Sequence, residues 1–542
     1  MTSRQNGARA LMQAIASAGV RRIFTLSGNH IMPVFDAALD AGIGLIHVRH
    51  EAAAVHMADA WSRLTGEPGI ALVTGGPGHA NAVGALYTAA MAEAPVLLLS
   101  GHAPNNQLGT GAFQEMRQAE IAAPLSKAAL TSARAEDLAG DFARAVRLAR
   151  SGRPGPVQFN LPVDCLEGEI DVAQAPDAAA FAAEPMPLAR GVAEDLLKRL
   201  TNAKRPLILA GPVFVTRTGR EIAAALQAAT GIPVVGMESP RGLGDPSLGA
   251  IAQMVAQADC ILLLGKRLDF TLKFGQPPAF APTCEFLQID AEADEIARTR
   301  RAVGDRLLAS ALAEPSSAAQ TLAQHARPAA QSGWLNDVKS AIAYRPAAWD
   351  TATSNQSGRL HPVQALRPLQ ALLDRHPESV FVSDGGEIGQ WAQACLTAPN
   401  RVINGVAGSI GAGLPFAVAA SLAKPGAPVI AVMGDGTFGF HPAEMDTAVR
   451  YKLPFLCVVG NDARWNAEYQ IQLRDYGSNR LHSCELLPTR YDNVAAAFGG
   501  HGALVTSAAE LLPAAERALA SGLPACLNVM IEGLAAPTVV RP

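Results

Sequence analysis

Short apolar runs that end in glycine alternate with alanine-rich segments along most of this chain. The runs GIALVTGG (69–76) and PVLLLSG (95–101) flank one such segment, and APVIAVMGDG (427–436) and PFLCVVGN (454–461) flank another. This alternation is typical of βαβ units, in which parallel strands are joined by crossover helices. The sequence therefore predicts an α/β fold built from doubly wound parallel sheets.

The chain is long enough for several such units. Its 542 residues correspond to about three domains at roughly 100 to 200 residues each. An Ala- and Pro-rich stretch at 173–187 and an irregular stretch at 343–362 interrupt the alternation, as linkers do. We expect domains over residues 1–172, 188–330 and 355–536.

Composition excludes several classes of function. Lys plus Arg number 44 against 48 for Asp plus Glu, so no global basic field attracts nucleic acid or an anionic membrane. No apolar run approaches the ~20 residues that a membrane span needs, and Leu11, Ile15 and Val20 favour a first helix over a transit peptide. The seven cysteines form no CxxC pair, which favours free thiols in a reducing compartment. We expect a soluble, cytoplasmic protein.

The first and last thirds share an internal spacing. Gly75 and Gly101 end two strands 26 positions apart, and Gly434 and Gly460 do the same at a constant offset of 359. Any two βαβ units look broadly alike, so the match can arise without duplication. If the two thirds are repeats, Gly76 takes the place of Asp435 and His102 that of Asn461, and one scaffold carries two kinds of chemistry.

Asp435 and Asn461 follow neighbouring predicted strands. A right-handed βαβ crossover brings both to the carboxyl edge of one sheet, which is where ligands bind. One carboxylate and one amide oxygen suit Mg²⁺, which completes its coordination with phosphate oxygens and water. Gly434 and Gly436 expose backbone N–H groups to a diphosphate, and a helix N-terminus near Thr437 would add positive potential.

The segment GDGTFGFHPAEMDTAVRYKLPFLCVVGN resembles the thiamine-diphosphate motif of the acetolactate synthase, benzaldehyde lyase and 2-hydroxyacyl-CoA lyase superfamily. The resemblance implies thiamine diphosphate and Mg²⁺ as cofactors, with Asp435, Asn461 and the carbonyl of Ala463 as metal ligands. The usual motif has two asparagines, and the first is Gly460 here, so we expect a softer loop at this point.

Glu51 follows a predicted strand and precedes an alanine-rich segment. A carboxylate there is by default a favourable charge at a helix N-terminus. The order RHEAAA, VTGGPGHANAV and GTGAFQEMRQAE is similar to the pyrimidine-binding domain of the same superfamily, which implies cofactor contacts for Glu51, Gly76 and Asn81. In that family the glutamate promotes loss of the thiazolium C2 proton, so Glu51 is our first candidate for catalysis.

GVAGSIGAGLPFA (405–417) resembles the family segment beneath the cofactor. Ser409 and Ile410 would contact the cofactor there, with Ile410 as the aliphatic wedge between its rings, although Ile410 could equally be plain core. The family pairs the pyrimidine-binding domain of one subunit with the diphosphate-binding domain of another. The resemblance therefore implies a homodimer or homotetramer with active sites at the dimer interface.

The middle third resembles the Rossmann-like central domain of the superfamily, where some members hold FAD or ADP. Its strand ends LGKRLDF and LQID could line such a pocket, but no GxGxxG follows a strand. That absence disfavours a dinucleotide-dependent dehydrogenase. A non-catalytic relic of the fold would have lost Glu51 or Asp435, and both are present.

The resemblance leaves the substrate open, because one cofactor serves decarboxylation, carboligation and cleavage. His30, in GNHIMPVFDA, stands where benzaldehyde lyase carries an active-site histidine, and Gln114 is a second polar candidate. A C-terminus without most of the extension that closes over CoA favours small 2-keto acids, aldehydes or 2-hydroxy ketones. The likeness of LGKRLDFTLKFGQPP to 2-hydroxyacyl-CoA lyases keeps an acyl-CoA lyase, or an oxalyl-CoA decarboxylase-like enzyme, as the alternative.

Overall fold

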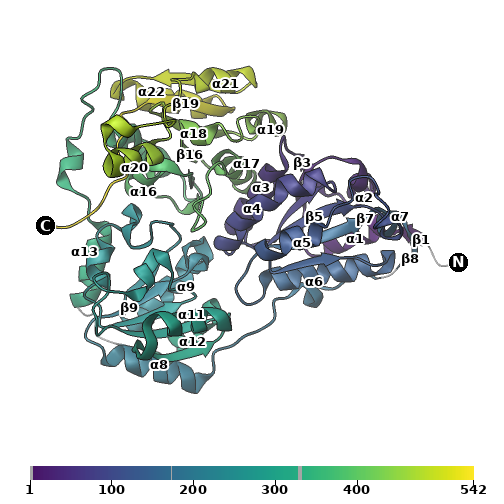
Figure 1. Ribbon diagram of the computed structural model, residues 1–542, viewed down its shortest axis with the longest axis horizontal. Helices are drawn as coiled ribbons and strands as arrows, with labels where there is room; N and C mark the ends of the chain where they lie inside the picture. The colour runs from purple at the N-terminus through teal and green to yellow at the C-terminus, as the bar shows by residue number, and fades with distance from the viewer. Residues whose placement is uncertain (1–3, 173, 328–332) are drawn as a thin grey trace.

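The computed structural model describes residues 4–172, 174–327 and 333–542, and it contains three parallel sheets (Figure 1). One sheet lies in each third of the chain, with helices packed on its faces, so the predicted doubly wound α/β architecture is confirmed. Residue 173 of the expected linker and residues 328–330 of the expected second domain lie outside the described residues. None of the described helices has both the length and the apolar character that a membrane crossing requires.

The first and third sheets have the same topology. Numbered within each sheet, both run in the order 2-1-3-4-6-5. The first sheet contains β2 (Arg22–Leu26), β3 (Gly44–His47), β4 (Gly69–Val73), β5 (Val96–His102), β6 (Ala128–Thr131) and β7 (Val157–Pro162). The third contains β14 (Val380–Ser383), β15 (Asn400–Ile403), β16 (Val429–Gly434), β17 (Phe455–Asn461), β18 (His501–Val505) and β19 (Pro524–Met530). The shared scaffold expected from the glycine spacing is therefore confirmed, with β4 and β5 equivalent to β16 and β17.

The central sheet is smaller and has helices on both faces. Its order is β10-β9-β11-β12-β13, and separate apolar clusters cover its two sides. Its strands are β9 (Pro206–Ala210), β10 (Val234–Gly236), β11 (Cys260–Leu264), β12 (Glu285–Asp290) and β13 (Leu307–Leu312). The covering helices include α8 (Arg190–Asn202), α9 (Arg217–Thr230) and α12 (Pro315–His325) on one side and α10 (Ile251–Val255) and α13 (Gly333–Ala343) on the other.

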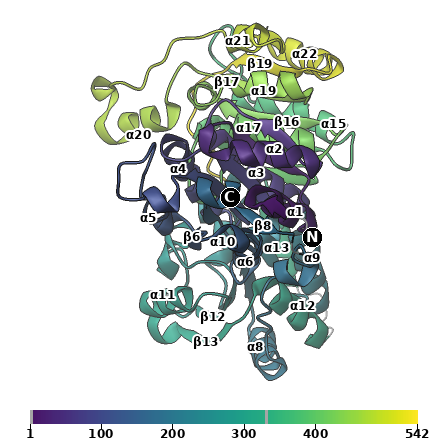
Figure 2. The ribbon, with the colours of Figure 1, turned by 90° about the vertical axis from the view of Figure 1, so that its right-hand side faces the viewer.

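The first and third domains share one apolar core. Helix α3 (Glu51–Thr65) packs against α17 (Gly413–Ala423), and the two helices lie close together in Figures 1 and 2. Val55 of α3 and Phe416 of α17 belong to the same buried cluster. The two domains that carry the predicted site residues are therefore fixed relative to each other by packing within one chain.

Gly460 lies inside a strand and not in a soft loop, so the expectation drawn from the missing asparagine is wrong. It pairs with Gly434 of β16 on one side and Val529 of β19 on the other. A Cβ at this position would lie 2.6 Å from Ile388 Cγ1 and 3.0 Å from Ile531 Cδ1. The side chains of Ile388 and Ile531 thus occupy the space that a larger residue would need.

Restoring the family asparagine should therefore destabilise the fold. We expect Gly460→Asn to lower the free energy of unfolding by about 1–3 kcal/mol, because overpacking forces neighbouring side chains to move. Urea denaturation followed by circular dichroism measures the change. Gly140→Ala, in α6 (Leu138–Arg150), is the matched control, since a Cβ there meets no heavy atom within 4 Å. An unchanged midpoint for Gly460→Asn would contradict the packing argument.

Candidate active site

A cavity of about 210 Å³ opens at the carboxyl edge of the third sheet. Strand β16 ends there at Gly434, and the short helix α18 (Asp435–Phe438) begins at the next residue. The central domain contributes Pro240 and Arg241 to the opposite wall. The residues predicted to bind a diphosphate line the cavity together, namely Gly434, Asp435, Gly436 and Thr437.

Asp435 is buried at the floor of this cavity, and one of its oxygens has no partner. Burial raises the pKa of Asp435 to about 6, although backbone N–H groups, including those of Gly436 and Ala463, oppose the rise. Its Oδ2 makes no hydrogen bond within the described part of the chain. Burial, and then the neighbouring charge of Asp435, raise the pKa of Asp462 to about 7. Two buried carboxylates with an unpartnered oxygen fit a bound cation, because an isolated buried charge is costly.

Asn461 is oriented to present its oxygen to the same place. It ends β17, and its Nδ2 donates to the Thr489 carbonyl and to Asn528 Oδ1, each at 3.0 Å. Both amide hydrogens are thereby used, so Oδ1 is left as an acceptor, 3.2 Å from the N–H of Ala463. The Ala463 carbonyl already accepts from the Leu486 N–H at 2.7 Å, which leaves it one further lone pair.

The Ile410 loop is anchored by Asp384, a residue that the sequence reasoning missed. The buried Asp384 carboxylate accepts from the N–H groups of Gly411 at 3.0 Å and Gly413 at 2.6 Å. Ile410 is half-buried and lines the cavity, so it is not plain core. A Cβ on Gly385 would lie 2.2 Å from Ile410 Cγ2, so a glycine is needed there. The neighbouring Ser409 does not line the cavity but holds the loop, because its carbonyl accepts from Asn404 at 2.8 Å.

The predicted first-domain residues gather at the carboxyl edge of their own sheet. Glu51, the first residue of α3, is buried and accepts from Asn81 Nδ2 at 3.1 Å. Gly76, at the end of β4, has room for no larger residue, because a Cβ there would lie 2.8 Å from Gln114 Cβ. Thr74 links this group to His30 through a 3.2 Å hydrogen bond. Glu51, Asn81, Gly76, Gln114 and His30 therefore form one polar edge.

Both ring nitrogens of His30 have hydrogen-bond partners. Burial is the main cause that lowers its pKa. Its Nε2 lies 3.2 Å from the Phe113 carbonyl, which can only accept, so Nε2 carries the hydrogen and Nδ1 accepts from Thr74. Its ring stacks on the exposed Phe113, with ring centroids 5.7 Å apart. A substrate group can reach His30 only if the Phe113 loop shifts.

The two groups of predicted residues do not meet within one chain. The described residues that line the third-domain cavity come from the central and third domains, and Glu51 is not among them. The cavity is also lined by residues that follow Ala463 in the chain, namely Trp465, Asn466 and Glu468. The ring of Trp465 covers Gly436, where a Cβ would lie 2.7 Å from it.

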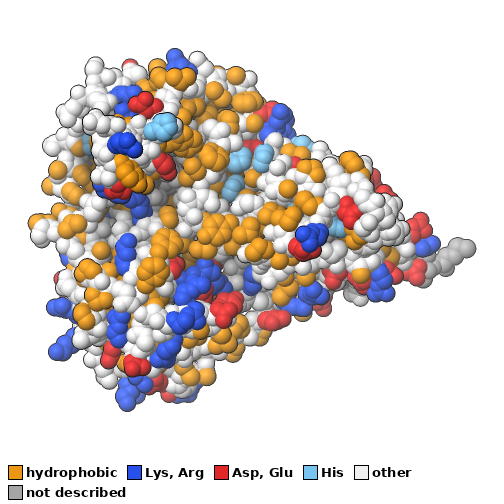
Figure 3. Space-filling view, viewed as in Figure 1, with side chains coloured by type: hydrophobic (Ala, Val, Ile, Leu, Met, Phe, Trp, Pro, Cys, Tyr) orange, Lys and Arg blue, Asp and Glu red, His pale blue; other side chains and the backbone are white. Residues whose placement is uncertain are grey.

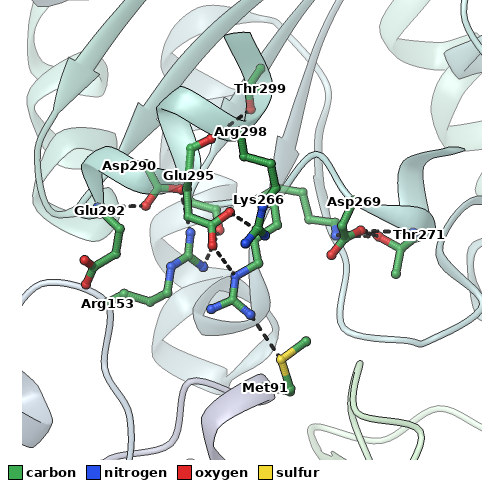
Figure 4. A network of polar contacts seen from close by, with 12 residues as sticks. Met91, Arg153, Lys266, Asp269, Thr271, Asp290, Glu292, Glu295, Arg298 and Thr299 are labelled. Carbon is green, nitrogen blue, oxygen red and sulfur yellow. Dashed lines mark hydrogen bonds and ion pairs between the residues drawn. The ribbon is translucent and has the colours of Figure 1, made fainter. Parts of the chain in front are cut away.

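The carboxyl edge of the central sheet does not fit FAD or ADP. Arg153, from the first domain, enters this edge and pairs with Glu93 and, at 2.5 Å, with Asp290 (Figure 4). Beside it, Glu295 binds both Arg267 and Arg298. The described voids here measure about 10 Å³ each, which is about the room that one water needs. The protein's own charges therefore occupy the place that a nucleotide would take.

Comparison with known proteins supports one family over nearly the whole chain. Family models described as thiamine pyrophosphate enzyme match at 5–121 (N-terminal TPP binding domain), 193–311 (central domain) and 384–529 (C-terminal TPP binding domain). An acetolactate synthase large subunit of Mycobacterium tuberculosis is 32% identical, over 98% of this chain and 96% of that protein. The 2-hydroxyacyl-CoA lyase 2 of Homo sapiens is 30% identical, over 97% of this chain and 90% of that protein. The 2-hydroxyacyl-CoA lyase 1 of Mus musculus is 31% identical, over 97% and 94%.

Proposed function

The chain belongs to the thiamine pyrophosphate enzyme family, and on that premise we propose a substrate class, a metal site and a subunit arrangement for it. It is a thiamine-diphosphate-dependent enzyme that makes or breaks carbon–carbon bonds. When bound, this cofactor would supply an electron sink for negative charge that develops on the substrate's former carbonyl carbon. The observation that carries the proposal is the unpartnered, buried carboxylate oxygen of Asp435 beside Ile410.

Asp435, Asn461 and the Ala463 carbonyl would hold Mg²⁺. They supply one carboxylate, one amide and one carbonyl oxygen, which is a donor set that this hard cation accepts. Gly434, Gly436 and Thr437 would hold the diphosphate at the start of α18. Ile410 would support the rings of the cofactor from below, on a loop held by Asp384 and by the bond between Asn404 and the Ser409 carbonyl.

Glu51 would act on the cofactor of a second chain. Its carboxylate lies on an edge that carries Asn81 and Gly76, away from the residues that line the Asp435 cavity. That edge continues into exposed apolar side chains, of which Phe113 is 66% exposed and Tyr87 42%. Apolar side chains also gather over the first domain in the space-filling view (Figure 3). A homodimer or homotetramer that buries this edge against the third domain of a partner would complete the site.

The substrate would be a small 2-keto acid, aldehyde or 2-hydroxy ketone. Both arginines that line the cavity are engaged: Arg241 pairs with Glu387 at 2.7 Å, and Arg464 lies 4.1 Å from the Tyr469 ring centroid. Because Arg241 is already ion-paired, the cavity offers one arginine fewer to the phosphates of a CoA substrate. His30 would exchange a proton with the substrate hydroxyl, and Gln114 would orient the carbonyl. The second candidate, a 2-hydroxyacyl-CoA lyase, is favoured by the similarity to the human and mouse lyases.

Removing the metal site should release the cofactor. We expect Asp435→Ala to bind thiamine diphosphate at least about tenfold more weakly, or about 1.4 kcal/mol, and a chelator followed by dialysis to abolish activity. Calorimetric titration with the cofactor in Mg²⁺ measures the affinity. Glu468→Ala is the matched control, because this carboxylate lines the same cavity but is exposed. Equal affinity in Asp435→Ala and the wild type would exclude the metal assignment.

Mixed subunits should recover activity that neither variant has alone. Glu51→Gln and Asp435→Ala each disable a different half of the site, so one of the two sites in a mixed dimer receives both intact residues. We expect partial activity after subunit exchange, measured beside a mass-labelled sample that proves the exchange. Proven exchange without recovery would mean that each site is built within one chain.

The substrate class can be read from a panel scored by product mass. The panel holds pyruvate, benzoin, simple aldehydes, formyl-CoA with an aldehyde, and a 2-hydroxyacyl-CoA. We expect turnover of the small substrates, and a loss of about 10² to 10⁴ in rate in His30→Ala at unchanged cofactor affinity, the range for a general acid or base. Turnover confined to the CoA substrates, with His30→Ala unaffected, would overturn the substrate class and leave the cofactor in place.

A further inference from the structure

The turn that leads into Glu51 is bound by the third domain of the same chain. The segment 45–50, called the turn below, comprises the end of β3 and the residues that join it to α3, and helix α19 (Glu444–Tyr451) lies beside it at the junction of the two domains (Figure 1). Helix α19 follows the α18 segment that begins with Asp435. One stretch of the third domain therefore carries a predicted metal ligand at one end and a contact with the Glu51 turn at the other.

Glu444 makes the central contact. Its side chain is 1% exposed, and its Oε1 accepts from the backbone N–H of Arg49 at 3.0 Å. The N–H of His50 also favours its charged form, whereas burial raises its pKa. Its Oε2 accepts from the Thr447 hydroxyl at 2.7 Å. A carboxylate that binds backbone N–H groups fixes their direction more firmly than a neutral acceptor does.

Two further residues of α19 bind the same turn. The Tyr451 hydroxyl accepts from the His47 N–H at 2.7 Å and donates to the Leu45 carbonyl at 2.9 Å. Arg450 donates to the His47 carbonyl at 2.7 Å. Successive backbone groups of the turn are thus bound by the third domain, up to the residue that precedes Glu51.

We propose that Glu444 is a positioning residue for Glu51. The proposal rests on the role given to Glu51 under the proposed function. Among the residues that the structure describes, Asn81 binds the Glu51 side chain at one oxygen, so the direction of this side chain depends on where α3 begins. That start is set by the backbone of Arg49 and His50, which Glu444 binds. Losing the charge on Glu444 would shift the Glu51 carboxylate without removing any group that touches cofactor or substrate.

The test separates activation of the cofactor from its binding. In Glu444→Gln we expect thiamine diphosphate affinity within twofold of the wild type, and C2 proton exchange of the bound cofactor about 10- to 100-fold slower, the cost of a small misplacement. Amide hydrogen exchange of a peptide spanning residues 47–55 should be faster, which reports the lost contact independently of activity. Glu516→Gln, in α22 (Ala508–Ala520), is the control in the same domain, because Glu516 pairs with the Arg375 side chain and not with the turn.

Two further variants distinguish a failure of the positioning proposal from a failure of the role proposed for Glu51. Tyr451→Phe should also slow C2 proton exchange of the bound cofactor, because it removes the hydroxyl that binds the turn. If Glu444→Gln does not fold, this variant tests the positioning proposal in its place. Glu51→Gln is the benchmark: if it exchanges at the wild-type rate, the role of Glu51 fails and the positioning proposal fails with it. Slow exchange in Glu51→Gln with wild-type exchange in Glu444→Gln and Tyr451→Phe would overturn the positioning role alone. Equal slowing in Glu516→Gln would also overturn it.

Discussion

The packing of α3 against α17 is the contact on which the site depends. Both helices begin at functional positions: α3 begins with Glu51, and α17 begins at Gly413, whose N–H is bound by Asp384. Their facing sides belong to one buried cluster that spans two domains. Arg63 of α3 lies over the Phe416 ring of α17 at 4.9 Å and donates to the Ile403 carbonyl at 2.8 Å. A shift of one helix along the other would therefore displace both the Glu51 carboxylate and the loop that carries Ile410.

Sequence reasoning found the central strands of the three parallel sheets and missed most of the edge strands. The runs around β4, β5, β16 and β17 are continuously apolar because helices cover both faces of a parallel sheet. In these sheets the strands that were not predicted are β6, β10, β13, β15 and β18, and each lies at the edge of its sheet, whereas the edge strand β3 was predicted. The short antiparallel pair of β1 (Arg4–Asn6) and β8 (Glu169–Asp171) was also missed. Strand β13, for example, alternates between buried and exposed residues. An edge strand carries a weaker apolar signal, which a single sequence does not separate from a loop.

The residues proposed for the site could be predicted where they follow a strand. They could not be predicted where they depend on contacts with residues distant in the sequence. Asp435 and Asn461 follow from the topology of one βαβ unit. The only signal for Asp384 is an acidic residue after a strand, in SDGG, and nothing nearby says that it will bind a loop some 27 positions later in the chain. The error over Gly460 has the same origin. The loss of an asparagine suggested a softer loop, whereas Ile388 and Ile531, distant in the sequence, fill the space.

The pairing of buried charges explains why the carboxyl edge of the central sheet is closed whereas that of the third sheet holds a cavity. At the central edge each buried carboxylate has an arginine, since Arg153 pairs with Asp290 and Glu93, and that edge is closed. At the third edge, burial and then the charge of Asp435 raise the pKa of Asp462, and the guanidinium of Arg464 offsets only part of this rise. This edge therefore carries negative charge that is not fully balanced by the described side chains, and the charge lies in a cavity of about 210 Å³. Burying an unpaired charge is costly, and two events relieve that cost: protonation, which the raised pKa values of Asp435 and Asp462 favour, and the binding of a cation. A bound cation would in turn allow an anionic ligand to bind at this edge.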